Sequence, residues 1–142
     1  MNNLSIYQEK ILGLAAKNKK IIALKDFNRS FEMRNPMCGD EVKVRIKLVE
    51  DKIIDISAVV RGCALCEASA GLVVELFKNK NVPDEKFLNE FLSWLENTEK
   101  SFSDQLPIEV EVFEPIREIK NRHKCITMPF EATCRSVDFR DN

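Results

Sequence analysis

The fold of this chain is decided by the stretch EVKVRIKLVEDKIIDISAVV, residues 41–60. In its first half, apolar side chains alternate with polar ones, which is typical of a strand with one buried face. The apolar set is Val42, Val44, Ile46 and Leu48. The second half is rich in β-branched residues, and Asp51-Lys52 gives a tight connection between the halves. The stretch therefore predicts an antiparallel β-hairpin.

Helical periodicity is found on both sides of this hairpin. The predicted helices lie at residues 6–16, 63–78, 84–95 and 108–113, with a last one from about Cys125 or Pro129 that frays before Asn142. Asp84 is the expected N-cap of the third helix, and residues 21–24 are expected to form a short strand or an extended link. We therefore predict an α+β fold, a small antiparallel sheet packed against several helices, with residues 1–142 as a single domain.

Composition limits the class of protein. The chain has 142 residues, of which 44% are hydrophobic and 32% charged, so we expect a folded domain with a hydrophobic core and not a disordered polymer. Lys and Arg number 22 against 23 Asp and Glu, so we expect neither nucleic acid nor a membrane as partner. No run is long enough to span a membrane and the first residues do not resemble a signal peptide, so we expect a cytoplasmic protein.

Five cysteines stand out in a chain of this kind. They are Cys38, Cys63, Cys66, Cys125 and Cys134. An odd number without a secretion signal makes a disulfide framework improbable. Each cysteine can be a small buried hydrophobe, a metal ligand or a reactive thiol, and its neighbours must decide.

The first cysteine lies in Asn35-Pro36-Met37-Cys38-Gly39-Asp40. Asn-Pro favours an extended or turn conformation, and Gly39 allows backbone angles that other residues avoid. The loop therefore presents Cys38 and Asp40 together, either as two ligands for one metal ion or simply as a turn in which Asp40 bonds the backbone. The motif alone does not separate these two interpretations.

Cys63 and Cys66 lie where the second strand gives way to a helix. The positive end of a helix dipole favours a thiolate there, and residues three apart share a helix face. C-x-x-C is also a redox signature, but that signature normally accompanies a βαβ pattern, which we do not find here. Packing in the core is the simpler interpretation of Cys66.

The third region is Arg122-His123-Lys124-Cys125. Its basic residues favour a thiolate at Cys125. His123 is the only histidine, so a multi-histidine metal site is excluded, and a capping or exposed role fits it better than ligation. Cys134 has no partner motif and is interpreted as structural. Three thiols and one carboxylate, from positions 38–40, 63 and 125, can converge on zinc or support an iron–sulfur cluster.

The ordered set of motifs resembles the IscU/SufU/NifU N-terminal family of iron–sulfur cluster assembly proteins. The motifs are Asn35-Pro-Met-Cys-Gly-Asp40, Gly62-Cys63 with Ala68-Ser69, and Arg122-x-x-Cys125 with Met128-Pro129-Phe130. The resemblance covers roughly residues 4–139. The long interval between the second and third motifs, with Arg122 three residues before the cysteine, resembles the SufU branch. Val60, Cys66 and Gly71 depart from the family pattern, in which Cys66 is usually replaced by serine or another small residue.

The resemblance implies that Cys38, Asp40, Cys63 and Cys125 are metal or cluster ligands. In a SufU-like protein they hold Zn²⁺, and Cys125 accepts persulfide sulfur from a SufS-like cysteine desulfurase. The sulfur then passes to apo iron–sulfur proteins or a SufBCD-like scaffold. Such a protein is a sulfur-transfer or scaffold protein and not a conventional enzyme.

Three alternatives remain at this point, and the simplest is a zinc-stabilised interaction domain that transfers no sulfur. An IscU-like scaffold would assemble a [2Fe–2S] cluster, or bind iron, on the same four ligands. A thiol oxidoreductase would use Cys63 and Cys66 and would not depend on Cys38 and Cys125.

Overall fold

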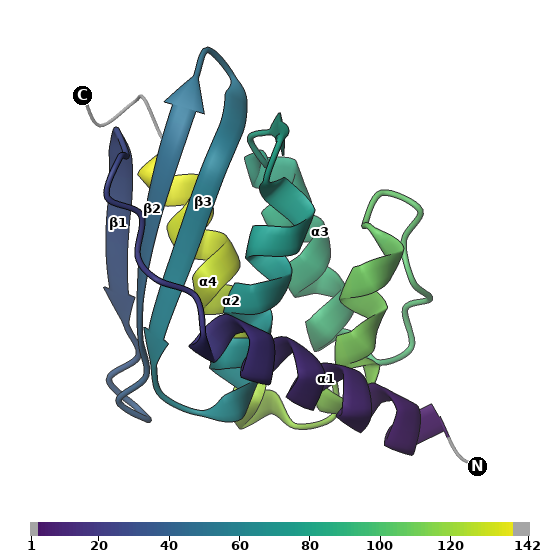
Figure 1. Ribbon diagram of the computed structural model, residues 1–142. Helices are drawn as coiled ribbons and strands as arrows, with labels where there is room; N and C mark the ends of the chain where they lie inside the picture. The colour runs from purple at the N-terminus through teal and green to yellow at the C-terminus, as the bar shows by residue number, and fades with distance from the viewer. Residues whose placement is uncertain (1–2, 138–142) are drawn as a thin grey trace.

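The computed structural model describes residues 3–137 and confirms the predicted α+β class, with a four-stranded antiparallel sheet at its centre (Figure 1). The strands follow the order β1-β2-β3-β4. Their bounds are β1 Arg29–Arg34, β2 Glu41–Val49, β3 Lys52–Arg61 and β4 Lys80–Asn81. The predicted hairpin is β2 and β3, and its turn falls at residues 50–51, where Glu50 has a φ of 57°.

The alternating apolar side chains of β2 are buried, as the sequence predicts. They are Val42, Val44, Ile46 and Leu48, each 5% exposed or less. Strands β1 and β4 were not predicted. β1 contributes only Phe31 and Met33 to the core, and β4 has two exposed residues, so neither leaves a clear hydrophobic pattern. Residues 21–24 form an extended link and not a strand, with the Leu24 N–H donating to Ser57 Oγ at 3.0 Å.

The predicted helices are present, with one change of type and one of start. Helices α1 Asn3–Lys19, α2 Ala64–Phe77, α3 Glu85–Glu96 and α4 His123–Ser136 are α-helical, whereas Ile108–Ile116 (η1) and Lys120–Arg122 (η2) are 3₁₀ turns. Asp84 caps α3 by accepting the Phe87 N–H at 2.9 Å, as expected. α4 begins at His123, so Cys125 lies in its first turn and Pro129 inside it. The predicted fraying beyond residue 137 lies outside the described residues.

Two helices cover the inner face of the sheet. α2 packs on β3, α4 packs on β1 and β2, α1 packs against α2, and α3 packs against α4 (Figure 1). Phe130 of α4 contacts three other aromatic rings, with the Phe91 ring centroid at 4.9 Å. Within residues 3–137 no helix is long and apolar enough to span a membrane.

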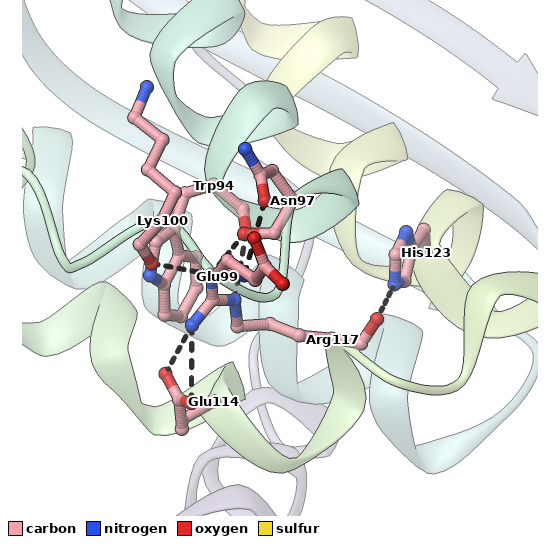
Figure 2. A network of polar contacts seen from close by, with 7 residues as sticks. All are labelled: Trp94, Asn97, Glu99, Lys100, Glu114, Arg117 and His123. Carbon is pink, nitrogen blue, oxygen red and sulfur yellow. Dashed lines mark hydrogen bonds and ion pairs between the residues drawn. The ribbon is translucent and has the colours of Figure 1, made fainter.

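A buried arginine ties the helical layer to the start of α4. Arg117, 4% exposed, donates to the carbonyl oxygens of Trp94 at 2.8 Å, Asn97 at 2.5 Å and Lys100 at 2.7 Å, and its guanidinium lies 4.6 Å from the Trp94 ring centroid (Figure 2). Its own carbonyl oxygen accepts a hydrogen bond from His123 Nε2 at 2.9 Å (Figure 2). The end of α3 is therefore held by the side chain of Arg117, and the first residue of α4 by the backbone carbonyl of the same residue.

Candidate metal centre

The loop between β1 and β2 is a closed turn that presents Cys38 and Asp40. Asn35 organises it: its N–H donates to Asp40 O at 2.8 Å, its carbonyl accepts the Gly39 N–H at 2.7 Å, and its side chain accepts the Met37 N–H at 3.1 Å. Gly39 has a φ of 78°, a conformation that glycine adopts without strain. The loop is a hydrogen-bonded turn, as one interpretation of the motif expects. It also presents Cys38, which is exposed, and Asp40, which is buried, as the metal-ligand interpretation requires.

Asp40 contacts the second predicted ligand directly. Its Oδ1 accepts the backbone N–H of Cys63 at 3.0 Å, and its Oδ2 lies 3.3 Å from Cys63 Sγ. Gly62 makes this approach possible, because a Cβ at that position would overlap the Asp40 carboxylate. The junction of β3 and α2 is therefore shaped around the carboxylate.

Cys125 completes the group from the first turn of α4. Its Sγ lies 4.0 Å from Cys38 Sγ, and it also interacts with the side chains of Asp40 and Cys63. Ligand atoms of Cys38, Asp40 and Cys125 all lie within 4.8 Å of one another. Four side chains from three segments far apart in the sequence thus meet at one place.

Two distances within this group are close to those expected between ligands of one zinc ion. With Zn–S bonds of about 2.3 Å and a Zn–O bond of about 2.0 Å, tetrahedral geometry separates two sulfurs by roughly 3.8 Å and a sulfur and an oxygen by roughly 3.5 Å. The corresponding distances are 4.0 Å for Cys38 to Cys125 and 3.3 Å for Cys63 to Asp40. Three sulfurs and one oxygen are also ligands that zinc accepts.

Electrostatics within the group favour a cation. Burial tends to raise the pKa of Asp40, but hydrogen bonds from the Cys125 thiol and from Cys63 outweigh it and lower that pKa. The pKa of the Cys125 thiol is raised, first by burial and then by Asp40 and Cys63. Burial and Asp40 therefore outweigh the flanking basic residues, which are expected from the sequence to favour a thiolate at Cys125. A bound cation reverses this effect because it stabilises thiolates.

Two basic residues that precede Cys125 differ in whether they contact its thiol. The Arg122 side chain hydrogen-bonds Cys125, and that bond raises the pKa of the guanidinium. Lys124 instead pairs with Glu131 at 2.9 Å. Arg122 therefore supplies positive charge beside a site whose ligands, when deprotonated, carry more negative charge than one divalent ion neutralises.

The remaining candidate residues lie outside the group of four. His123 Nε2 faces the carbonyl oxygens of Ile116 and Arg117 at 3.1 and 2.9 Å, which agrees with a capping role and not with ligation. Cys66 is fully buried, with burial raising the pKa of its thiol. Cys134 lies near Pro83 O at 3.9 Å, away from the site, and burial raises the pKa of its thiol to about 12.

Sequence reasoning missed three supports of the site. Ser69 Oγ donates to the carbonyl of Ile126 at 2.5 Å and joins α2 to α4 beside Cys125. Gly62 accommodates Asp40, and Arg117 holds the segment that precedes α4. Ser69 and Gly62 belong to the quoted motifs, so the motifs held a signal for them, whereas nothing near Arg117 in the sequence indicates a buried network.

Comparison with known proteins identifies the family of the chain. The model of the NifU-like N terminal domain matches residues 6–93, which is more than half of the chain. The chain therefore belongs to the NifU-like N-terminal domain family.

Its similarity to individual members is distant but extensive. It is 25% identical over 107 residues to the zinc-dependent sulfurtransferase SufU of Bacillus subtilis, covering 75% of this chain and 72% of that protein. It is 27% identical over 131 residues to the iron–sulfur cluster assembly scaffold protein IscU of Thermotoga maritima, covering 89% and 88%. A crystal structure described as a putative scaffold protein for the SUF system, from Fervidobacterium islandicum, has the same fold, with a TM-score of 0.77, 24% identity and coverage of 96% and 100%.

Proposed function

We propose that this protein is an iron–sulfur cluster assembly protein that binds zinc through Cys38, Asp40, Cys63 and Cys125 and accepts sulfur on Cys125. The observation that carries the proposal is that ligand atoms of Cys38, Asp40 and Cys125 lie within 4.8 Å of one another, with Cys63 Sγ 3.3 Å from Asp40 Oδ2. When bound, the ion holds its cysteine ligands as thiolates. Similarity to a protein named as a zinc-dependent sulfurtransferase supports this role.

The partner that supplies the sulfur is a cysteine desulfurase of the SufS type. Cys125 Sγ attacks the terminal sulfur of the donor persulfide, the donor S–S bond breaks, the donor leaves as a thiolate, and a persulfide forms on Cys125. Cys125 is fully buried whereas its neighbour Cys38 is exposed. We therefore place the entry of the donor at the turn of residues 35–40, which must move aside. An apo iron–sulfur protein or a SufBCD-like scaffold, in the cytoplasm, receives the sulfur.

The test combines metal analysis with desulfurase stimulation. We expect about one zinc per chain in the freshly purified protein, and we expect stimulation of a SufS-type desulfurase to disappear in Cys125→Ala. Cys134→Ala is the matched control, because this cysteine lies on the same helix outside the site. Stimulation that survives in Cys125→Ala removes that residue from the role, and a full complement of zinc in Asp40→Ala removes the carboxylate from the ligand set.

An IscU-like scaffold for a [2Fe–2S] cluster is the second candidate, and it is supported by relatives that are named as IscU scaffold proteins. The same four residues would bind the cluster. Anaerobic reconstitution with iron and sulfide separates the candidates. A stable chromophore that transfers to apo-ferredoxin supports the scaffold, and a colourless zinc protein supports the sulfur relay.

A further inference from the structure

A second thiol lies in the same helical turn as one of the proposed ligands. Cys63 is the N-cap of α2, and its sulfur accepts the backbone N–H of Cys66 at 3.5 Å. Cys63 is partly exposed and belongs to the metal centre, whereas Cys66 is fully buried behind it. The proposed zinc site uses the first thiol and leaves the second without a function.

The two cysteines share the first turn of α2. The N–H of Cys66 points at Cys63 Sγ, which places the Cys63 sulfur beside the backbone that carries Cys66. Residues three apart in a helical turn have Cβ atoms about 5–6 Å apart. A disulfide needs Cβ atoms roughly 3.5–4.5 Å apart. The turn must therefore tighten by about 1–2 Å to join this pair.

We propose that Cys66 is a resolving thiol that reduces a persulfide on Cys63 to sulfide and closes a Cys63–Cys66 disulfide. The proposal rests on the proposed function for the origin of the sulfur, since Cys63 contacts Cys125, the proposed acceptor. A cluster requires sulfide, whereas a desulfurase delivers sulfane sulfur. A neighbouring thiol supplies the missing electrons within the same chain.

The step is balanced without an external oxidant. The Cys66 sulfur attacks the inner sulfur of the Cys63 persulfide, a Cys63–Cys66 S–S bond forms, and the bond to the terminal sulfur breaks. The terminal sulfur leaves with that electron pair and takes the Cys66 proton, so it departs as hydrogen sulfide. The Cys66 sulfur is oxidised and the sulfane sulfur is reduced. A dithiol reductant must then open the disulfide before the next cycle.

Metal occupancy controls this reaction. Cys63 cannot bind an ion and form a disulfide at the same time, so zinc protects the pair and metal-free protein is the reactive form. The competing interpretations are that Cys66 only fills the core, or that Cys38 and Cys125, whose sulfurs are 4.0 Å apart, form the disulfide instead.

Trypsin separates these possibilities cleanly. Cleavage after Arg61 and Lys78 gives a peptide of residues 62–78 whose only cysteines are Cys63 and Cys66. Metal-depleted protein is treated anaerobically with glutathione persulfide and desalted, and free thiols are alkylated without reduction. Released sulfide is measured in the reaction mixture before desalting, and peptide masses are measured after alkylation. Variants are Cys66→Ser, Cys66→Ala and the off-site control Cys134→Ser, each checked for folding by circular dichroism.

In wild type and Cys134→Ser we expect the 62–78 peptide to be unalkylated and two hydrogens lighter, with sulfide released in equal amount. In both Cys66 variants we expect a retained persulfide and sulfide release at background. Zinc-loaded wild type should give neither product. Equal sulfide release from the Cys66 variants, or a cross-link only between the Cys38 and Cys125 peptides, overturns the proposal.

The same measurements separate this inference from the proposed function, because the persulfide donor is a small molecule. If the desulfurase is not stimulated but the 62–78 disulfide forms, the sulfur-acceptor role fails and the dithiol stands. If Cys125-dependent stimulation is found without the disulfide, the resolving role of Cys66 fails alone.

Discussion

The substitution Gly62→Ala tests whether the Asp40 carboxylate is held where the metal centre needs it. A Cβ at position 62 would overlap the carboxylate, so the Asp40 side chain must rotate away. The chain then loses the hydrogen bond from the Cys63 N–H to Asp40 Oδ1, whose length is 3.0 Å. A hydrogen bond to a charged group contributes about 1.5–3 kcal/mol to stability.

We expect two separate effects of this substitution. The free energy of unfolding of the metal-free protein should fall by about 1–2 kcal/mol, because the lost hydrogen bond is partly offset by the roughly 0.4–1 kcal/mol that replacing glycine contributes through the unfolded state. Zinc affinity should fall by at least ~10–100-fold, the usual cost of disturbing a group that orients metal ligands. Urea unfolding measures the first effect, and competition with a chelator measures the second.

Two other glycines provide matched controls. A Cβ at Gly13 meets nothing within 4 Å, so Gly13→Ala should stabilise α1 by about 0.5–1 kcal/mol. A Cβ at Gly71 would lie 2.8 Å from the carbonyl oxygen of Leu14, so Gly71→Ala should destabilise the α1–α2 contact by about 1–3 kcal/mol. Neither should change the zinc affinity of the folded protein. Wild-type zinc affinity in Gly62→Ala would refute the placement of Asp40 in the coordination sphere.

Three further predictions concern Arg117 and His123, which hold the start of α4, and Cys134, which lies away from the site. Arg117→Ala leaves three backbone carbonyls without their donor. It should reduce the free energy of unfolding, measured by urea titration, by about 3–5 kcal/mol, and Arg117→Lys should reduce it by less. A loss below about 1 kcal/mol would contradict the proposed network. His123→Ala removes the hydrogen bonds to the carbonyl oxygens of Ile116 and Arg117, so the free energy of unfolding should fall by about 1–2 kcal/mol. The zinc content should not change, and loss of zinc from a folded variant would make His123 a ligand. Burial raises the pKa of the Cys134 thiol from 9.0 to about 12 in the folded protein. The contribution of this thiol to stability is therefore complete below pH 9 and disappears as the pH rises toward 12. Cys134→Ala should make the melting temperature fall less steeply over this pH range, and an unchanged fall would argue against a role of Cys134 in it.

The alternation of apolar and polar residues is sufficient to predict a strand where that strand buries one whole face. The alternation in residues 41–48 predicts β2 because every second side chain enters the core. In β1, partly buried and exposed residues also alternate, but its two apolar side chains lie among four polar ones. β1 is therefore recognised as a strand mainly by its pairing with β2. Sequence alone therefore predicts the central hairpin and misses the strand at its edge.

Charge near a residue in sequence was a poor guide to charge near it in space. Arg122 and Lys124 both flank Cys125, yet only Arg122 contacts the thiol, and Lys124 pairs with Glu131. Burial and the neighbouring Asp40 outweigh them and raise the pKa of the Cys125 thiol. The helical period shows which side chains share a face of α4. Which residues each face contacts is known only once α4 is packed on the sheet.

Half of the metal centre follows from strand register and half does not. Val49 pairs with Lys52 at the turn and, past one bulge, Glu41 pairs with Arg61, so the next residues along, Asp40 and Gly62, lie opposite each other. The turn at residues 50–51 thus brings the carboxylate to the start of α2, and a register prediction could have found this contact. No such rule reaches Cys125, because its position depends on α4 packing across β1 and β2 and on Ser69 and Arg117 holding its first turn. Shifting the β2–β3 register should therefore disrupt the Asp40–Cys63 half of the site, whereas loosening the α3–α4 connection should release Cys125 and leave that half intact.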